Sequence, residues 1–282
     1  MPKVTSLELI KEARKNNNAV GAFNVYNLES IQAVSEGIKE ANATVIFQIT
    51  VSAIKYGGLK NIYDIIMNSI DDYQITAAVH LDHGPSLKVV DECLAIGFSS
   101  IMLDGSSLPF EENIKQTGMA REKSHSKGAT CEGELGRLVG VEDEVNVTKA
   151  DEIYTHPDEA LRFVSETGID LLAVAIGNAH GFYKGEPHID FDRLALIRKA
   201  VNTELVLHGA SGIPDKSIQR AISLGIGKIN IDTEFRYATM QGISHFLKDD
   251  PDTAKAREAL AVGRQMMKEK VIEKANLFRP NH

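Results

Sequence analysis

Short runs of β-branched and other apolar residues recur about every thirty residues along the chain, and each has the length of a buried strand. Between them lie segments such as 28–41 and 191–201, whose apolar residues repeat every three or four positions, as on one face of a helix. The runs predict eight strands: 19–24, 44–50, 76–81, 99–103, 129–134, 171–177, 205–208 and 228–231. Strict alternation of buried strands and helices indicates a parallel sheet, either doubly wound or closed into a barrel.

Eight strand–helix units followed by a helical C-terminus favour the closed form, a (β/α)8 TIM barrel with extra C-terminal helices. The dinucleotide-binding form of the open sheet is disfavoured because no G-x-G-x-x-G follows the first strand. No low-complexity linker divides the chain. We therefore expect a single domain over residues 1–282, in which 235–282 form the helical extension.

Polar and ionisable residues gather where the predicted strands end, and six consecutive strands, from the third to the eighth, end in this way. Packing alone does not explain apolar runs that terminate so consistently, whereas a barrel places its active site at the C-terminal ends of its strands. The residues concerned are His80, Asp82, His83, Asp104, Glu132, Glu134, His180, His208, Asn230 and Asp232.

Three histidines at these strand ends predict a metal site, since neutral imidazoles from different strands can hold zinc and leave one coordination position open. His180 and His208 follow or close their strands. His80 and His83 are three residues apart and should point to opposite faces of an extended strand, so only one of them can face the metal. We choose His83, which stands at the very end of the strand. Asp82 then remains for proton transfer. The other histidines are expected at the surface: His125, His156, His188, His245 and His282.

The glycine-rich segment 208–214 (HGASGIP) follows the seventh predicted strand, the segment 230–234 (NIDTE) follows the eighth, and each leads into a helix. Such loops form the usual phosphate site of a barrel, where backbone N–H groups and helix N-termini bind the anion. Alone, Gly209 and Gly212 would equally fit ordinary tight turns. Beside a metal site they favour a phosphorylated substrate with an oxygen for the metal.

A metal next to a phosphate suits polarisation of a carbonyl group. The alternative route through a Schiff base needs a lysine at the mouth of the barrel, and none of the eight predicted strand ends carries one. Lys228 begins the last predicted strand and is therefore expected at the opposite face of the barrel. Metal-dependent chemistry is the better interpretation.

Composition narrows the class of partner. The 282 residues carry 31 Lys and Arg against 39 Asp and Glu, a net charge of −8 that argues against nucleic-acid or anionic-membrane binding. The chain has 2 cysteines, the first thirty residues lack the features of a signal peptide, and no apolar run is long enough to span a bilayer. We expect a reducing, cytoplasmic location.

Five motifs resemble the class II, zinc-dependent ketose-bisphosphate aldolases, the family that contains fructose- and tagatose-bisphosphate aldolases. They are HLDHG, EGELG, AHGFYKGEP, LHGASGIP and KINIDTE, and the resemblance extends from Gly21 to about Lys270. HLDHG with the two later histidines in that order is highly specific, while the glycine loops alone are weak. The resemblance implies a lyase of carbohydrate metabolism, such as glycolysis, that forms a homodimer or homotetramer, with 254–276 as the interface helix.

The resemblance also implies the site residues. His83, His180 and His208 would bind the catalytic Zn²⁺. Asp104 and Glu134 match positions that hold a second divalent ion or the vacated zinc position, and a monovalent cation is a further expected cofactor. Two residues would act in catalysis: Asp82 on the proton of the C4 hydroxyl, and Glu142, in the loop 137–144, on the C3 proton. Substrate-binding residues would be Asn24, Thr50, Gly181, Gly209, Ala210, Ser211, Asn230, Ile231, Asp232 and Thr233, with Arg257 of a neighbouring subunit at the distal phosphate.

The implied reaction is reversible cleavage of fructose or tagatose 1,6-bisphosphate to dihydroxyacetone phosphate and glyceraldehyde 3-phosphate. Some motifs resemble those of fructose-specific members and others those of tagatose-specific members, so the choice between the two sugars stays open. Other phosphorylated ketoses are also possible substrates. Cobalt or manganese could replace zinc. Two remoter alternatives are a barrel metallohydrolase and a sugar-phosphate sensor. The metallohydrolase would require His-x-His on the first strand, which contains no histidine, and the sensor should have lost Asp82 or a metal ligand, all of which are present.

Overall fold

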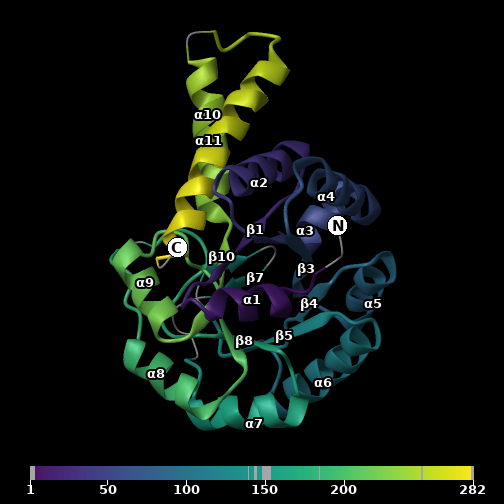
Figure 1. Cartoon of the computed structure of the whole chain (residues 1–282), viewed down its shortest axis with the longest axis vertical. Helices are drawn as coiled ribbons and strands as arrows, with labels where there is room; N and C mark the ends of the chain where they lie inside the picture. Colours follow the sequence, from purple (N-terminus) through teal and green to yellow (C-terminus); the bar gives the residue numbers. More distant parts are fainter. Residues whose placement is uncertain are drawn as a thin grey trace.

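Eight parallel strands close into a barrel in the computed structural model, which describes residues 4–138, 140–142, 145–147, 154–183, 185–248 and 250–280 (Figure 1). The order around the barrel is β1-β10-β9-β8-β5-β4-β3-β2. The barrel strands are β1 (Val20–Asn24), β2 (Val45–Ile49), β3 (Ala77–Gly84), β4 (Ser100–Leu103), β5 (Thr130–Leu135), β8 (Leu171–Val174), β9 (Glu204–Leu207) and β10 (Ile226–Ile231). Each predicted strand overlaps one of these, which confirms the (β/α)8 barrel.

Helices surround the barrel and alternate with its strands (Figure 1). They are α1 (Ser6–Arg14), α2 (Leu28–Glu40), α3 (Val51–Gly57), α4 (Leu59–Tyr73), α5 (Leu87–Ile96), α6 (Phe110–Ser126), α7 (Pro157–Thr167), α8 (Phe191–Ala200), α9 (Asp215–Ser223), α10 (Thr233–Leu247) and α11 (Ala256–Leu277). Local sequence begins several of them: the Asn27 side chain accepts a hydrogen bond from the Ser30 backbone at the start of α2, and Thr5 caps α1 in the same way. The extension predicted over 235–282 contains most of α10 and all of α11, which pack on each other and project beyond the barrel (Figure 1).

The barrel interior changes from apolar to polar along the strand direction. In its first layers Val20, Ala22, Ile46 and other small or branched residues pack against Leu9 and Ile10 of α1, which closes the N-terminal end. Two residues further along each strand, the same inward alternation brings polar groups into the lumen. They are Asn24, Gln48, His80, Asp82, Glu132, Glu134, Lys228 and Asn230, all buried. This gradient is what places a polar site at the C-terminal mouth.

The prediction that His80 and His83 point to opposite faces is wrong. His80 lies inside the barrel, near Lys228, and the His83 ring lies 4.8 Å from the ring of His208. Strict alternation fails because His83 has a left-handed backbone, with φ of 46°, and the pairing of β3 with β4 shifts register between Leu81 and Gly84. Both rings therefore turn inward.

The expected position of Lys228 is also wrong. β10 begins at Ile226, so Lys228 is an interior residue of the strand and not its first one. Its side chain is fully buried in the lumen, where Nζ lies 2.8 Å from Oε2 of Glu132.

None of the described helices is long and apolar enough to cross a membrane.

Candidate active site

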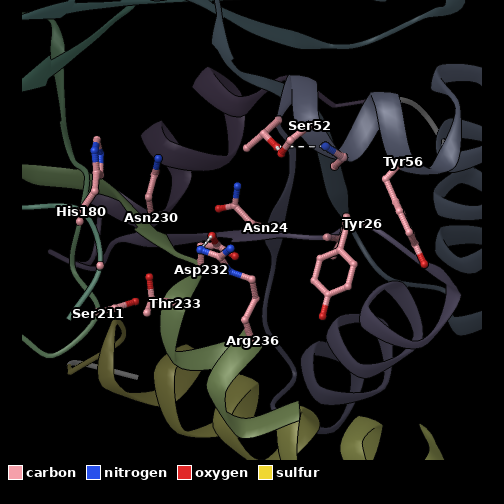
Figure 2. A pocket seen from close by; sticks show the side chains of 15 residues that line it. Asn24, Tyr26, Ser52, Tyr56, His180, Ser211, Asn230, Asp232, Thr233 and Arg236 are labelled. Carbon is pink, nitrogen blue, oxygen red and sulfur yellow. Dashed lines mark hydrogen bonds and ion pairs between the residues drawn. The ribbon is translucent and has the colours of Figure 1, made fainter. Parts of the chain in front are cut away.

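A cavity of about 740 Å³ opens at the C-terminal ends of the strands, a volume suited to a small organic ligand. Figure 2 shows it extending from His180 past Asn230 and Asn24 toward Tyr26 and Tyr56. Its walls come from the loops after β1, β8, β9 and β10 and from α3 and α10. The site is therefore built by segments far apart in the sequence.

The three histidines predicted to bind a metal meet beside this cavity. His83 ends β3, His180 follows β8 and His208 follows β9, and one ring nitrogen of each lies within 4.8 Å of the others. Their ring centroids are 4.8–6.2 Å apart. Nδ1 of His208 is buried and finds no hydrogen-bond partner among the described residues. A buried ring nitrogen without a hydrogen-bond partner, close to two further imidazoles, fits a site for a divalent cation such as zinc.

A second group shares His83. His83, Asp104 and Glu134 also place ligand atoms within 4.8 Å of one another. Nδ1 of His83 lies 2.7 Å from Oδ2 of Asp104 and 3.7 Å from Oε2 of Glu134. Burial would raise the pKa of Asp104, but the hydrogen bond from His83 holds that pKa well below its usual range. The two predicted carboxylates are thus brought to the edge of the three-histidine cluster, and they can hold a second cation.

Amide side chains from three strands hold Asp82 beside the histidines. Nδ2 of Asn24 donates to Oδ2 of Asp82 at 2.8 Å, and Nδ2 of Asn230 donates to Oδ1 at 3.4 Å. Gln48 in turn donates to Oδ1 of Asn24 at 3.0 Å. Asp82 lies 4.0 Å from Nε2 of His83. The carboxylate is therefore fixed next to the His83 imidazole, a position that fits the predicted proton-transfer role.

The glycine-rich loop after β9 and the segment 230–234 after β10 lie together on one side of the cavity. Gly212 donates its backbone N–H to Oε1 of Glu234 at 2.7 Å, and Oγ of Ser211 accepts from the Glu234 backbone at 3.3 Å. Oε2 of Glu234 pairs with Lys274 of α11 at 2.9 Å. The loop after β9 is thus clasped to the start of α10. Eight of the predicted substrate-binding residues line the cavity: Asn24, Thr50, Gly181, Gly209, Ser211, Asn230, Asp232 and Thr233.

The remaining predicted site residues either do not line this cavity or have side chains outside the described part of the chain. Ala210 and Ile231 are buried and are not among the residues that line the cavity. Glu142 ends β6 (Gly140–Glu142), which pairs with β7 (Val145–Val147), but its side chain lies outside the described part of the chain. Arg257 lies in the first turn of α11, and the cavity of its own chain is lined without it. His282 also lies outside the described residues.

Sequence reasoning missed several residues of the cavity wall. Tyr26 follows β1, while Ser52 and Tyr56 belong to α3, where Oγ of Ser52 lies 2.8 Å from Oγ1 of the predicted Thr50. Arg236 stands four residues after Asp232 and pairs with it at 2.8 Å (Figure 2). The i, i+4 spacing at the start of a helix was the available signal for that pair. The tyrosines carry no local signal.

Gly209→Ala is expected to lower the free energy of unfolding by about 3 kcal/mol, as measured by urea denaturation. Gly209 has a φ of 60°, and an added Cβ would lie 2.2 Å from the carbonyl oxygen of Ala179, next to His180. The matched control is Gly128→Ala, with a φ of 67° and nothing within 4 Å. It should cost about 1 kcal/mol. Equal losses in both variants would contradict the close approach of the two loops.

The fold and the site define a barrel enzyme with a candidate metal centre. The family model of class II fructose-bisphosphate aldolases matches residues 4–282, and the chain belongs to that family. It is therefore an aldolase, a carbon–carbon lyase, as the motifs predicted. The family generally uses a divalent metal and acts on phosphorylated sugars.

Three relatives illustrate the match. A protein of Alkalicoccus urumqiensis named sulfofructosephosphate aldolase is 37% identical over 278 residues, covering 99% of this chain and 97% of that protein. The crystal structure of the YdjI aldolase from Escherichia coli K12 is 33% identical with a TM-score of 0.86, covering 99% of this chain and 98% of the other. A fructose-bisphosphate aldolase structure from Campylobacter jejuni, 23% identical with a TM-score of 0.80 over 98% and 95% of the chains, supports the fold alone.

Proposed function

We propose that the protein catalyses metal-dependent, reversible aldol cleavage of a ketose 1,6-bisphosphate, either fructose or tagatose 1,6-bisphosphate. The products would be dihydroxyacetone phosphate and glyceraldehyde 3-phosphate. The observation that carries the proposal is the meeting of three imidazoles, one carboxylate held by amide groups, and the loops after β9 and β10 at a single cavity. Family membership supports the same class of reaction.

The metal would be Zn²⁺, held by His83, His180 and His208. Three imidazoles suit zinc in a site that keeps one position open for substrate, although cobalt and manganese are also compatible with such ligands. When bound, the ion supplies polarisation of the ketose carbonyl and compensation of developing negative charge. Asp104 and Glu134 would hold a second divalent ion, and we retain a monovalent cation as a further cofactor.

Asp82 would accept the proton of the C4 hydroxyl. The electron pair of that O–H bond forms the aldehyde C=O, the C3–C4 bond breaks, and its electrons pass to C3. Glu142 is the proposed donor of the proton that C3 then takes up. In condensation both transfers run in reverse. Asn24 and Asn230 keep the Asp82 carboxylate oriented for its part.

The glycine loops would bind the C1 phosphate. The proposed donors to this anion are the backbone N–H groups of Gly181, Gly209 and Ala210, together with Ser211 and the residues from the end of β10 to the start of α10. The residues from β10 to α10 are Asn230, Ile231, Asp232 and Thr233. Thr50 lies farther along the cavity wall. Arg257 from a second subunit would bind the distal phosphate, which makes a homodimer or homotetramer part of the proposal.

A second candidate substrate is sulfofructose phosphate. The relative of Alkalicoccus urumqiensis that carries this substrate in its name is 37% identical to the chain. The metal, Asp82 and the C1-phosphate loops would serve both substrate classes alike. Discrimination would therefore fall to the far end of the cavity, where Tyr26, Ser52 and Tyr56 lie (Figure 2).

The test compares initial cleavage rates of fructose 1,6-bisphosphate, tagatose 1,6-bisphosphate and sulfofructose phosphate by the zinc-loaded protein. Reduction of the released dihydroxyacetone phosphate provides a common readout. We expect kcat/KM for one bisphosphate to exceed that for the sulfonate at least about tenfold, as expected when one charged contact differs. The opposite ratio would assign the protein to the second candidate. Absence of cleavage with all three would overturn the proposed function.

A further inference from the structure

A chain of polar side chains lies in the lumen directly below the three-histidine cluster. It joins four strands and the residue after a fifth, and every member is fully buried or 1% exposed. Its members are Ser100 of β4, His80 of β3, Lys228 of β10, Glu132 of β5 and His208 after β9. Buried charge of this kind is costly unless every group is paired. Neither the proposed reaction nor the metal ligation uses Ser100, His80, Lys228 or Glu132.

The contacts of Glu132 determine where His208 carries its hydrogen. Oε1 of Glu132 lies 2.9 Å from Nε2 of His208, and Oε2 lies 2.8 Å from Nζ of Lys228. An ionised carboxylate only accepts hydrogen bonds, so Nε2 of His208 must be the N–H donor. In neutral imidazole the other nitrogen, Nδ1, then has a lone pair. Nδ1 has no hydrogen-bond partner among the described residues and lies 3.8 Å from Oε2 of Glu134, so with Nε2 engaged by Glu132 it is the ring nitrogen left for the three-histidine cluster.

Lys228 maintains the charge of Glu132. Nζ of Lys228 lies 2.8 Å from Oε2 of Glu132 and both side chains are fully buried, so the buried carboxylate is paired with an ammonium group and not isolated. On the other side, burial and the Lys228 charge keep the pKa of His80 well below its usual value. Neutral His80 can then accept from Lys228 through Nε2, at 3.5 Å, and donate to Ser100 through Nδ1, at 2.7 Å. The direction of each hydrogen bond is thus determined.

We propose that Glu132 and Lys228 are positioning residues that hold His208 in the Nε2–H tautomer and so present Nδ1 to the metal. The inference rests on the proposed function in that His208 is taken as a metal ligand. A carboxylate behind a ligating histidine orients the ring and raises its basicity, and its loss typically weakens metal binding 10–100-fold. Lys228 is engaged by this carboxylate, which accounts for a lysine in the lumen without a Schiff base.

The variant that tests this role is Glu132→Gln combined with Lys228→Met. A single substitution would leave the other charge buried and unpaired, whereas the double substitution removes both charges together. Zinc affinity is measured by competition with a chromogenic chelator, and the dissociation constant is expected to rise roughly 10–100-fold. Histidine ¹⁵N chemical shifts of the metal-free protein report the tautomer. The wild type should show one Nε2–H form at His208, and the variant a mixture.

Ser100→Ala is the matched control, because it removes a hydrogen bond at the far end of the same chain without touching Glu132 or His208. Its zinc affinity should stay within about twofold of wild type, a difference below 0.5 kcal/mol. Zinc binding by the double variant within twofold of wild type would overturn the inference. So would an Nδ1–H form of His208 in the wild type, a result independent of whether the variant folds. Wild-type protein that binds no zinc would instead reject the proposed metal site.

Discussion

Asp82→Asn is expected to lower kcat for ketose cleavage by a factor of roughly 10²–10⁴, the usual contribution of a general acid–base group. Asparagine keeps the size of the side chain, but its amide cannot take a proton from the C4 hydroxyl. Zinc affinity should change little, because Asp82 is not one of the proposed ligands and its Oδ1 lies 4.0 Å from Nε2 of His83. The measurement is steady-state cleavage of the bisphosphate on which the wild type is most active.

A partial reaction separates the proton-transfer role from a structural one. Dihydroxyacetone phosphate has no C4 hydroxyl, so exchange of its C3 proton with solvent does not require Asp82. We expect Asp82→Asn to retain that exchange to within about tenfold, as followed by proton NMR in deuterated water. Loss of exchange and cleavage to the same extent would contradict the assigned role. Full retention of cleavage would do so as well.

His83→Ala is expected to weaken zinc binding by a factor on the order of 10²–10³ and to lower cleavage on the order of 10³-fold at limiting zinc. His83 belongs to both ligand groups, so its loss removes one imidazole from the three-histidine cluster and the link to Asp104 and Glu134. Zinc affinity is measured by chelator competition and cleavage by the coupled assay. Both should fall together.

The matched control for His83→Ala is His125→Ala. His125 lies on α6, away from the cavity lining, and contacts Asp170 through Nε2 at 2.9 Å. Its removal should leave zinc affinity and cleavage within about twofold of wild type, since the hydrogen bond lost lies on α6 and none of the proposed site residues takes part in it. Equal losses in the two variants would indicate general destabilisation and would contradict the assignment of His83.

The barrel could be predicted because each of its strands corresponds to a short apolar run that can be recognised in the local sequence. Runs such as Leu171–Val174 are apolar on both faces, and their spacing leaves room for a helix between each pair. The location of the site at the mouth of the barrel could be predicted from one rule, that active-site residues lie at the C-terminal ends of the strands. That rule was enough to select His83, His180 and His208, which the structure brings together.

The positions that escaped prediction depend on register or on distant partners. The left-handed backbone at His83 cannot be read from HLDHG, because alternation along the strand predicts the opposite face. The pairing of Glu132 with Lys228 joins residues 96 positions apart. The contact of Glu234 with Lys274 likewise joins the glycine loops to the last helix. Each requires the closed barrel to be known first.

The central claim is that a metal ion, and not a lysine imine, supports carbon–carbon cleavage. The most direct measurement is the cleavage rate of the protein stripped with a chelator, then supplied with zinc, and separately treated with borohydride in the presence of dihydroxyacetone phosphate. We expect stripping to abolish cleavage, stoichiometric zinc to restore it, and borohydride to leave the activity and mass of the protein unchanged. Full activity without metal, together with borohydride-trapped product on a lysine such as Lys228, would contradict the account.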